Sequence, residues 1–223
     1  ISYDDSHSIG LKAKYIREQN LGGAMIWELS QDWEGELLNS LYEGLHDGSV
    51  LPARDYVGHW AQPVIQKWLD MEYITGYPDG TFRPEDFITR AEFVTIVNKA
   101  FGYEETGEIA FTDVEEESWY YEEVQKAYRE GEIIGVSKTR FAPEDYITRE
   151  QAAIIMARLV NLDGYSKGAG VFTDSIQISS WAREYVGAAA YHNLIKGYED
   201  NTFRPQNNIK RAEAVVLLDR ILQ

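Results

Sequence analysis

The sequence predicts a mainly α-helical protein made of three copies of one helix–loop–helix unit, with a short segment of β/α character in front of them. One pattern of apolar, glycine, proline and arginine positions recurs without gaps behind three tryptophans, Trp60, Trp119 and Trp181. Apolar residues inside each copy also recur with the period of an α-helix. A repeat of this kind indicates that one structural unit is present several times.

Each copy is expected to contain two helices. The first begins near the tryptophan and carries one apolar stripe, and the second follows after an ordered loop and carries another. The stripes of the first helices are Ile65, Trp68, Leu69; Val124, Ala127, Tyr128; and Val186, Ala189, Ala190. Those of the second helices include Phe93, Ile96, Val97; Ala152, Ile155, Met156; and Ala214, Leu217, Leu218.

Capping residues mark the start of the second helices. Thr89 and Thr148 each stand three residues before a Glu or Gln, which is the capping-box pattern. The third copy has Lys210 at this position, so its helix start is expected to be less secure or to gain a positive charge. Upstream, Gly76 and Gly197 follow apolar runs, and we expect them to end the first helices in a left-handed conformation.

An arginine stands just inside each second helix. These residues are Arg90, Arg149 and Arg211. A cation there faces the positive end of the helix dipole, which costs about 0.3–1 kcal/mol at an exposed site. Three repetitions of an unfavourable choice predict an anion nearby. It is either an external carboxylate or phosphate, or an internal partner among the aspartates that precede the repeat tryptophans, Asp55, Asp113 and Asp174.

Residues 1–50 do not share the repeat. Residues 8–20 are predicted to form a helix, 24–29 a buried parallel strand that contains Trp27, and 36–45 a further helix. Helix, strand and helix in this order are typical of a β/α barrel. Residues 46–54 form a short polar connection and the expected domain boundary.

Composition excludes several kinds of site. The chain has no cysteine, its four histidines lack ligand spacing and no calcium-loop pattern is present, so neither a metal nor a cofactor is expected. No stretch approaches the roughly 20 apolar residues of a membrane span. The net charge of −16 argues against general binding to nucleic acid or to anionic membranes. Because the chain opens on Ile1 without a signal-peptide pattern, we expect targeting information to lie upstream.

The repeats closely resemble S-layer homology domains, which usually occur in sets of three. The resemblance is carried by GYPDGTF at residues 76–82, GYEDNTF at 197–203 and ITRAE at 88–92. It implies a pseudo-threefold arrangement around a central three-helix bundle, with grooves between neighbouring repeats that bind secondary cell-wall polymer. Such polymers commonly end in pyruvylated N-acetylmannosamine, whose carboxylate matches the anion expected beside the arginines.

The resemblance assigns roles position by position. It implies that the arginines bind the carboxylate, that the aspartates accept sugar hydroxyls, and that the tryptophans stack on a sugar ring, although tryptophans at helical spacing also fit a purely structural role in the core. Asp79-Gly80 is a tight-turn signal in repeat one. Repeat two lacks the tyrosine and the Asp-Gly turn, so the groove of Arg149 is expected to be degenerate. The predicted carbohydrate-binding set is completed by Gly76, Tyr77, Gly197, Tyr198 and Lys210.

Residues 3–32 look like the last β/α units of a family-18 glycoside hydrolase, the chitinase class. In that family a strand-end tryptophan forms the floor of the sugar subsite at the cleaved bond, and Trp27 matches it. The acid-bearing D-x-x-D-x-D-x-E strand of the family is absent from this sequence, so no catalytic residue is assigned. The segment is interpreted as a remnant of a larger enzyme.

Four parts are therefore predicted: the glycosidase-like fragment at 1–50 and repeats at 51–105, 106–165 and 166–223. The predicted function is that of a secreted, monomeric, non-catalytic module at the bacterial cell wall or S-layer surface. It tethers a glycoside hydrolase or an S-layer-type protein through a pyruvylated wall glycan. The alternatives are a working part of a chitinase-like glycosidase and self-assembly through the repeat faces.

Overall fold

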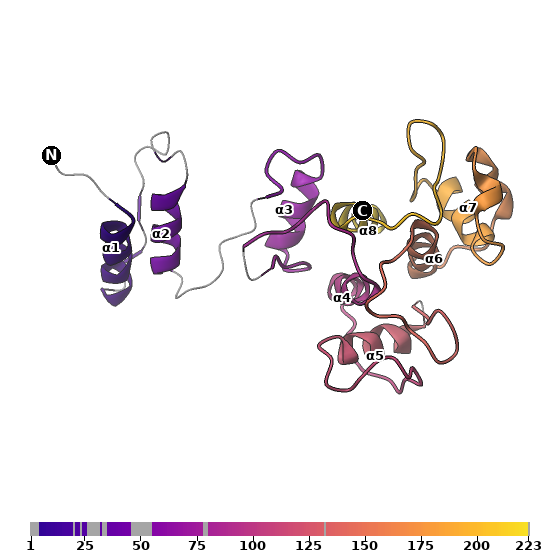
Figure 1. Ribbon diagram of the computed structural model, residues 1–223, viewed down its shortest axis with the longest axis horizontal. Helices are drawn as coiled ribbons and strands as arrows, with labels where there is room; N and C mark the ends of the chain where they lie inside the picture. Colours follow the sequence, from indigo (N-terminus) through magenta and orange to yellow (C-terminus); the bar gives the residue numbers. More distant parts are fainter. Residues whose placement is uncertain are drawn as a thin grey trace. The chain divides into compact units, whose positions relative to one another are not determined.

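The structure of the protein is a computed structural model that describes residues 5–19, 21–22, 24–25, 32, 35–45, 55–77, 80–131 and 133–222. It confirms the prediction of a mainly α-helical chain (Figure 1). Trp27, most of the predicted strand and the connection at 46–54 lie outside the described residues. The chain falls into two compact units, one from residues 1–55 and 76–82 and the other from 56–75 and 83–223.

The first unit contains the two helices predicted before the repeats. These are α1 (Ser6–Glu18) and α2 (Glu36–Leu45), and they pack against each other. Asp32 caps α2 by accepting hydrogen bonds from two backbone amides of its first turn, at 2.9 and 3.2 Å. The helices cross closely, because a Cβ atom at Gly44 would lie 2.3 Å from that of Ala13.

The second unit contains the helices of the three repeats. They are α3 (Gln62–Asp70), α4 (Arg90–Phe101), α5 (Tyr121–Glu130), α6 (Arg149–Leu159), α7 (Arg183–Tyr191) and α8 (Arg211–Ile221), with the 3₁₀ segments η1 (Ser166–Val171) and η2 (Ser175–Gln177) before α7. Each second helix packs against the first helix of another repeat: α4 against α5, α6 against α7, and α8 against α3. Figure 1 shows α4, α6 and α8 nearest to one another, each with its partner on the outside.

Backbone hydrogen bonds connect the repeats in a cycle. Antiparallel bridges join Thr89 to Tyr146, Thr148 to Asn208, and Lys210 to Phe87. The backbone N–H groups at the helix starts donate to carbonyls of the next repeat, from Arg90 to Asp145, from Arg149 to Asn207, and from Arg211 to Asp86, at 2.8–2.9 Å. These bonds satisfy helix N–H groups that have no partner within their own helix. The last repeat is thereby joined to the first.

A buried polar contact fixes α3 on α8. Trp68 is fully buried, and its Nε1 donates to Oδ1 of Asp219 at 2.8 Å. The ammonium of Lys67 lies 2.6 Å from the same oxygen. A buried carboxylate needs such donors because its desolvation is otherwise costly. This contact specifies which helix surfaces meet where the cycle closes.

The helix starts agree with the capping predictions. Thr89 and Thr148 have extended backbones and form complete capping boxes. At Lys210 the backbone N–H donates to Glu213 at 2.9 Å, but an ammonium has no acceptor atom to return the bond to the helix. The third helix start therefore has half of the capping box, and Lys210 forms an ion pair with Glu85 instead.

The prediction of left-handed glycines at the ends of the first helices is wrong. Gly76 and Gly197 do not have a positive φ; the left-handed residues are Glu72 after α3 and Asn193 after α7, both with φ of 59°. Gly197 is required for another reason. A Cβ there would lie 2.9 Å from a backbone oxygen and 3.2 Å from the ring of Phe172, so the loop backbone lies directly against the ring.

Candidate functional site

The repeat arginines are buried at the first position of their helices. Arg90 is 4% exposed, Arg149 9% and Arg211 5%. Buried guanidinium groups need hydrogen-bond acceptors around them. These acceptors decide between the internal and the external anion that the sequence left open.

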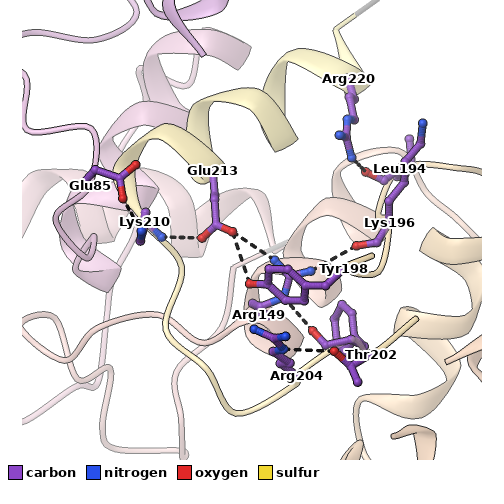
Figure 2. Close-up of polar contacts among 11 residues, drawn as sticks. Glu85, Arg149, Leu194, Lys196, Tyr198, Thr202, Arg204, Lys210, Glu213 and Arg220 are labelled. Carbon is purple, nitrogen blue, oxygen red and sulfur yellow. Dashed lines mark hydrogen bonds and ion pairs between the residues drawn. The ribbon is translucent and has the colours of Figure 1, made fainter. Parts of the chain in front are cut away.

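Arg149 reaches from α6 into the loop of repeat three (Figure 2). Its Nε donates to the carbonyl of Phe203 at 2.7 Å and its Nη2 to that of Lys196 at 3.2 Å. Its Nη1 lies 3.5 Å from Oε1 of Glu213, and its guanidinium carbon lies 4.5 Å from the centre of the Tyr198 ring. Two carbonyl oxygens and a carboxylate therefore offset part of the repulsion between Arg149 and the positive end of the helix dipole.

A pocket of about 160 Å³ opens beside Arg149. Its lining includes Trp60 from repeat one, Gly197 and Tyr198 from repeat three, and Arg220 from α8. Burial raises the pKa of the Tyr198 hydroxyl, although Arg149 acts to lower it, so the group stays protonated at neutral pH and can donate a hydrogen bond. Gly197 and Tyr198 therefore lie in one pocket with Arg149, while their role in carbohydrate binding stays a prediction.

Arg90 lies in the corresponding place between repeats one and two. Its Nε donates to the carbonyl of Phe141 at 2.8 Å and its Nη2 to that of Ile134 at 3.1 Å. The position that Glu213 has beside Arg149 is taken here by Gln151. Among the described residues no carboxylate lies within ion-pair distance of Arg90. Burial lowers the pKa of Arg90 to about 10, so it stays charged at neutral pH.

A larger pocket, of about 430 Å³, opens beside Arg90. It is lined by the repeat-two loop at Gly135 and Val136, by Gln151 and by Trp181 of repeat three. Val136 stands where repeat three has Tyr198, and the smaller side chain leaves more space. The expectation that the degenerate loop weakens the groove of Arg149 is therefore wrong, because each arginine uses the loop of the following repeat.

Arg211 has an internal carboxylate partner. Its Nη1 lies 3.1 Å from Oε1 of Glu92, and its Nη2 lies 3.5 Å from the carbonyl of Thr75. Glu92 is also the capping-box residue of α4, as Glu213 is at α8. Two of the three arginines are therefore paired with glutamates of the next helix start.

The aspartates accept hydrogen bonds from backbone amides, and within the described part of the chain neither Asp113 nor Asp174 forms an ion pair with Arg90 or Arg149. Asp113 accepts from the amides of Phe141 and Ala142 at 2.9 and 2.8 Å. Asp174 binds the equivalent amides in repeat three, both at 2.7 Å, and Asp55 accepts from Phe82 at 2.6 Å. The aspartates thus hold the loops whose carbonyls accept from the arginines. A contact with sugar hydroxyls stays a prediction.

The repeat tryptophans are at the surface. Trp60 is 62% exposed, Trp119 64% and Trp181 56%, so a role as core residues is excluded. Trp60 lines the pocket of Arg149 and Trp181 that of Arg90. An exposed indole beside a cavity offers a flat face on which a ring can stack.

Tyr77, another predicted residue, forms part of a turn in the first unit. The amide of Tyr77 donates to the carbonyl of Thr81 at 2.7 Å, and Gly80, with φ of 79°, donates back to Tyr77 at 2.9 Å. Gly76 directly precedes this turn. A Gly at this positive φ matches the tight turn expected from the sequence.

Two basic residues in the grooves were missed. Arg158 lines the pocket of Arg90 and Arg220 that of Arg149, one from the last turn of α6 and the other from that of α8. The signal was present in the sequence, because a basic residue follows each repeat arginine at the same interval, as Lys99, Arg158 and Arg220.

The part of the chain that the structure describes contains no group of three or more His, Cys, Asp or Glu side chains suited to a metal ion. Within the same residues, no helix combines the length and the apolar character needed to cross a membrane.

Comparison with known proteins agrees with the repeats. The S-layer homology domain model matches residues 54–94, 110–153 and 171–215, and the glycosyl hydrolases family 18 model matches residues 1–32. The chain is 32% identical over 170 residues to the surface-layer 125 kDa protein of Lysinibacillus sphaericus, covering 75% of this chain and 14% of that protein. It is 35% identical over 158 residues to the cellulosome-anchoring protein of Acetivibrio thermocellus, covering 68% of this chain and 35% of that protein.

A further relative is an enzyme. Chitinase ChiA of Flavobacterium johnsoniae is 52% identical over 54 residues, which are 23% of this chain and 3% of that enzyme. The chain thus spans only a small part of each of these relatives. Because the three repeat matches cover more than half of the chain, the protein belongs to the S-layer homology domain family, whose members are held at the cell surface.

Proposed function

We propose that this chain is a non-catalytic anchoring module that binds a pyruvylated secondary cell-wall polymer. In this proposal the repeats hold an attached protein on the wall without covalent bonds. The observation that carries it is the pairing, in both described pockets, of a buried guanidinium with an exposed indole, Arg90 with Trp181 and Arg149 with Trp60. In a sugar that bears a carboxylate, the carboxylate can bind the guanidinium and the sugar ring can stack on the indole.

The way the arginines are held supports recognition of a fixed ligand. Two backbone carbonyls orient each guanidinium in the described pockets, so little side-chain entropy is lost when a ligand arrives. The acidic chain, with a net charge of −16, does not attract polyanions in general. Recognition by a few placed cations therefore favours a polymer with a specific acidic sugar. Several linked grooves would raise the avidity without new contacts.

We further propose that residues 1–32 are the end of a family-18 glycoside hydrolase to which the anchor is attached. The family-18 match and the similarity to a chitinase over 54 residues support this. A working glycosidase formed by this chain alone is the second candidate. Since the acid-bearing strand is not in the sequence, we expect no turnover of chitin oligomers by the chain.

The anchoring proposal is tested by sedimentation with purified cell-wall sacculi. We expect the chain to be retained, and to be released when acid extraction removes the polymer from the sacculi. The combined variant Trp60→Ala and Trp181→Ala should bind more weakly with unchanged folding, because both side chains are exposed. Ile176→Ala, which truncates an 86% exposed residue outside the pockets, serves as the matched control. Undiminished retention on stripped peptidoglycan would contradict the proposal.

A further inference from the structure

The three repeat arginines differ in the partner of Nη1. Nη1 of Arg149 is paired with Glu213 and Nη1 of Arg211 with Glu92. Nη1 of Arg90 has no hydrogen-bond or ion-pair partner among the described residues, while Nε and Nη2 of Arg90 are bound to carbonyls. Arg90 is 4% exposed and lines the larger pocket. It is therefore a buried cation that lines a cavity and keeps donor capacity at Nη1.

The difference is caused by one residue, Gln151. Glu92, Gln151 and Glu213 occupy the same capping position, and one oxygen of each accepts from the backbone N–H of the residue before its helix. In the glutamates the second carboxylate oxygen then meets the arginine of the preceding repeat. In Gln151 the cap uses the only side-chain oxygen, Oε1, at 3.1 Å from the amide of Thr148, so the other branch is the amide nitrogen.

The amide orientation of Gln151 follows from this chemistry. If the amide nitrogen faced the backbone N–H of the cap, two donors would meet and the cap would be lost. With the oxygen at the cap, the Gln151 nitrogen and Nη1 of Arg90 are two donors on the walls of the same pocket. A carboxylate has two oxygens to accept from both.

The surroundings of this pocket contain further positive charge. Arg158 also lines it, and Arg158 forms no ion pair with any described residue; its guanidinium carbon lies 5.0 Å from the centre of the Tyr185 ring. The carboxylates that act on Arg90, Asp145 and Asp113, lie beyond ion-pair distance. Asp113 is already occupied by two backbone amides.

We propose that the Arg90 groove is the principal carboxylate site of the chain, and that Gln151 makes it so by withholding the internal counter-ion that Glu213 and Glu92 provide to the other two arginines. This inference rests on the proposed function, since it names which groove recognises the acidic sugar and which residue selects for it. A ligand carboxylate enters the Arg90 groove without competition. Beside Arg149 it must displace or approach a carboxylate that belongs to the protein.

The test is isothermal titration of the complete chain with the methyl glycoside of pyruvylated N-acetylmannosamine. The methyl ester of the same compound is the uncharged comparison. Gln151→Glu should weaken binding of the acid by about tenfold, the size expected when one charge-assisted hydrogen bond is replaced by repulsion, and should leave binding of the ester nearly unchanged. Glu213→Gln should have the opposite effect on the weaker site.

The variants are expected to fold. Gln151→Glu introduces the residue that the other two repeats have at this capping position, and thermal unfolding followed by circular dichroism checks this. Gln177→Glu adds the same charge at an exposed residue that lines neither pocket, and should bind the acid like the wild type.

The possible failures are distinguishable. If the wild type prefers the acid over the ester and Gln151→Glu binds the acid as tightly as the wild type does, the assignment of the Arg90 groove is wrong while the anchoring proposal stands. If the wild type binds the acid no better than the ester, recognition of a sugar carboxylate itself is wrong, and the inference fails with it.

Discussion

Replacing Asp113 by Asn is expected to destabilise the fold and only secondarily to weaken ligand binding. Each oxygen of the Asp113 carboxylate accepts one backbone N–H, from Phe141 at 2.9 Å and from Ala142 at 2.8 Å. Asparagine has one oxygen, so one amide keeps a neutral hydrogen bond and the other faces an NH₂ group. The residue it holds, Ala142, has an unfavourable φ of 58°.

The magnitude follows from these contacts. A hydrogen bond to a charged group contributes about 1.5–3 kcal/mol, and one such bond is lost while the other becomes neutral, so we expect a loss of about 2–3 kcal/mol in the free energy of unfolding. For a chain of this size about 2–4 °C of melting temperature corresponds to 1 kcal/mol, which gives a decrease of roughly 4–12 °C. Calorimetry measures it, with Asp163→Asn at an exposed position as the control.

The pH dependence provides an independent check. Burial acts to raise the pKa of Asp113, but the hydrogen bonds from the Phe141 and Ala142 amides outweigh it, and the pKa lies below its ordinary value of 3.8. A carboxylate whose pKa is lowered by folding stabilises the folded state above the ordinary pKa, and this contribution is lost as the pH falls through the lowered value. The difference in the free energy of unfolding between wild type and Asp113→Asn should therefore shrink as the pH falls below 3.8. An unchanged melting temperature together with weaker polymer binding would refute the structural role and favour a sugar-binding one.

Two further predictions concern the closure of the cycle and the loop glycine. Trp68→Phe removes the bond from the buried Nε1 to Asp219, so we expect a loss of about 1.5–3 kcal/mol in urea unfolding, and a cost under 0.5 kcal/mol would show that α3 is not held on α8 in this way. Gly197→Ala places a Cβ 2.9 Å from the carbonyl oxygen of Thr202 and 3.2 Å from the Phe172 ring. We expect this overpacking to lower the free energy of unfolding by about 1–3 kcal/mol and to weaken binding at the Arg149 groove. An unaffected melting temperature would contradict the close approach.

The helices and their caps could be predicted from local sequence. Thr89 and Thr148 carry a capping signal that lies within three residues, and the apolar periods behind them are those of a helix. The need for glycine at position 197 could not be predicted. It arises from the close approach of the Phe172 ring, which is distant in sequence. Local sequence instead predicts a left-handed Gly197 at the end of α7, where the left-handed residue is in fact Asn193.

The candidate site was predicted as a set of residues but not as an assembly. The sequence predicts both Arg90 and Trp181 as site residues, yet nothing in the spacing shows that an arginine of repeat one shares a pocket with a tryptophan of repeat three. Which loop faces which arginine depends on the cyclic packing of the helices. The effect of having Gln151 in place of a glutamate could not be predicted for the same reason. Gln and Glu cap a helix alike, and they differ here only because the second terminal atom of the side chain faces an arginine of another repeat.

The contact of α3 with α8 has a mechanical consequence. Under the anchoring proposal, tension that an attached protein transmits along the chain ahead of α3 reaches this contact first. Trp60 precedes α3 and lines the pocket of Arg149. Stripping α3 from α8 under strain would carry the indole out of that pocket. The groove of Arg90 is lined by α4, the loop at 134–136, α6 and Trp181, and so contains no residue of α3 or α8. The two grooves would therefore differ in how they withstand shear at the cell surface.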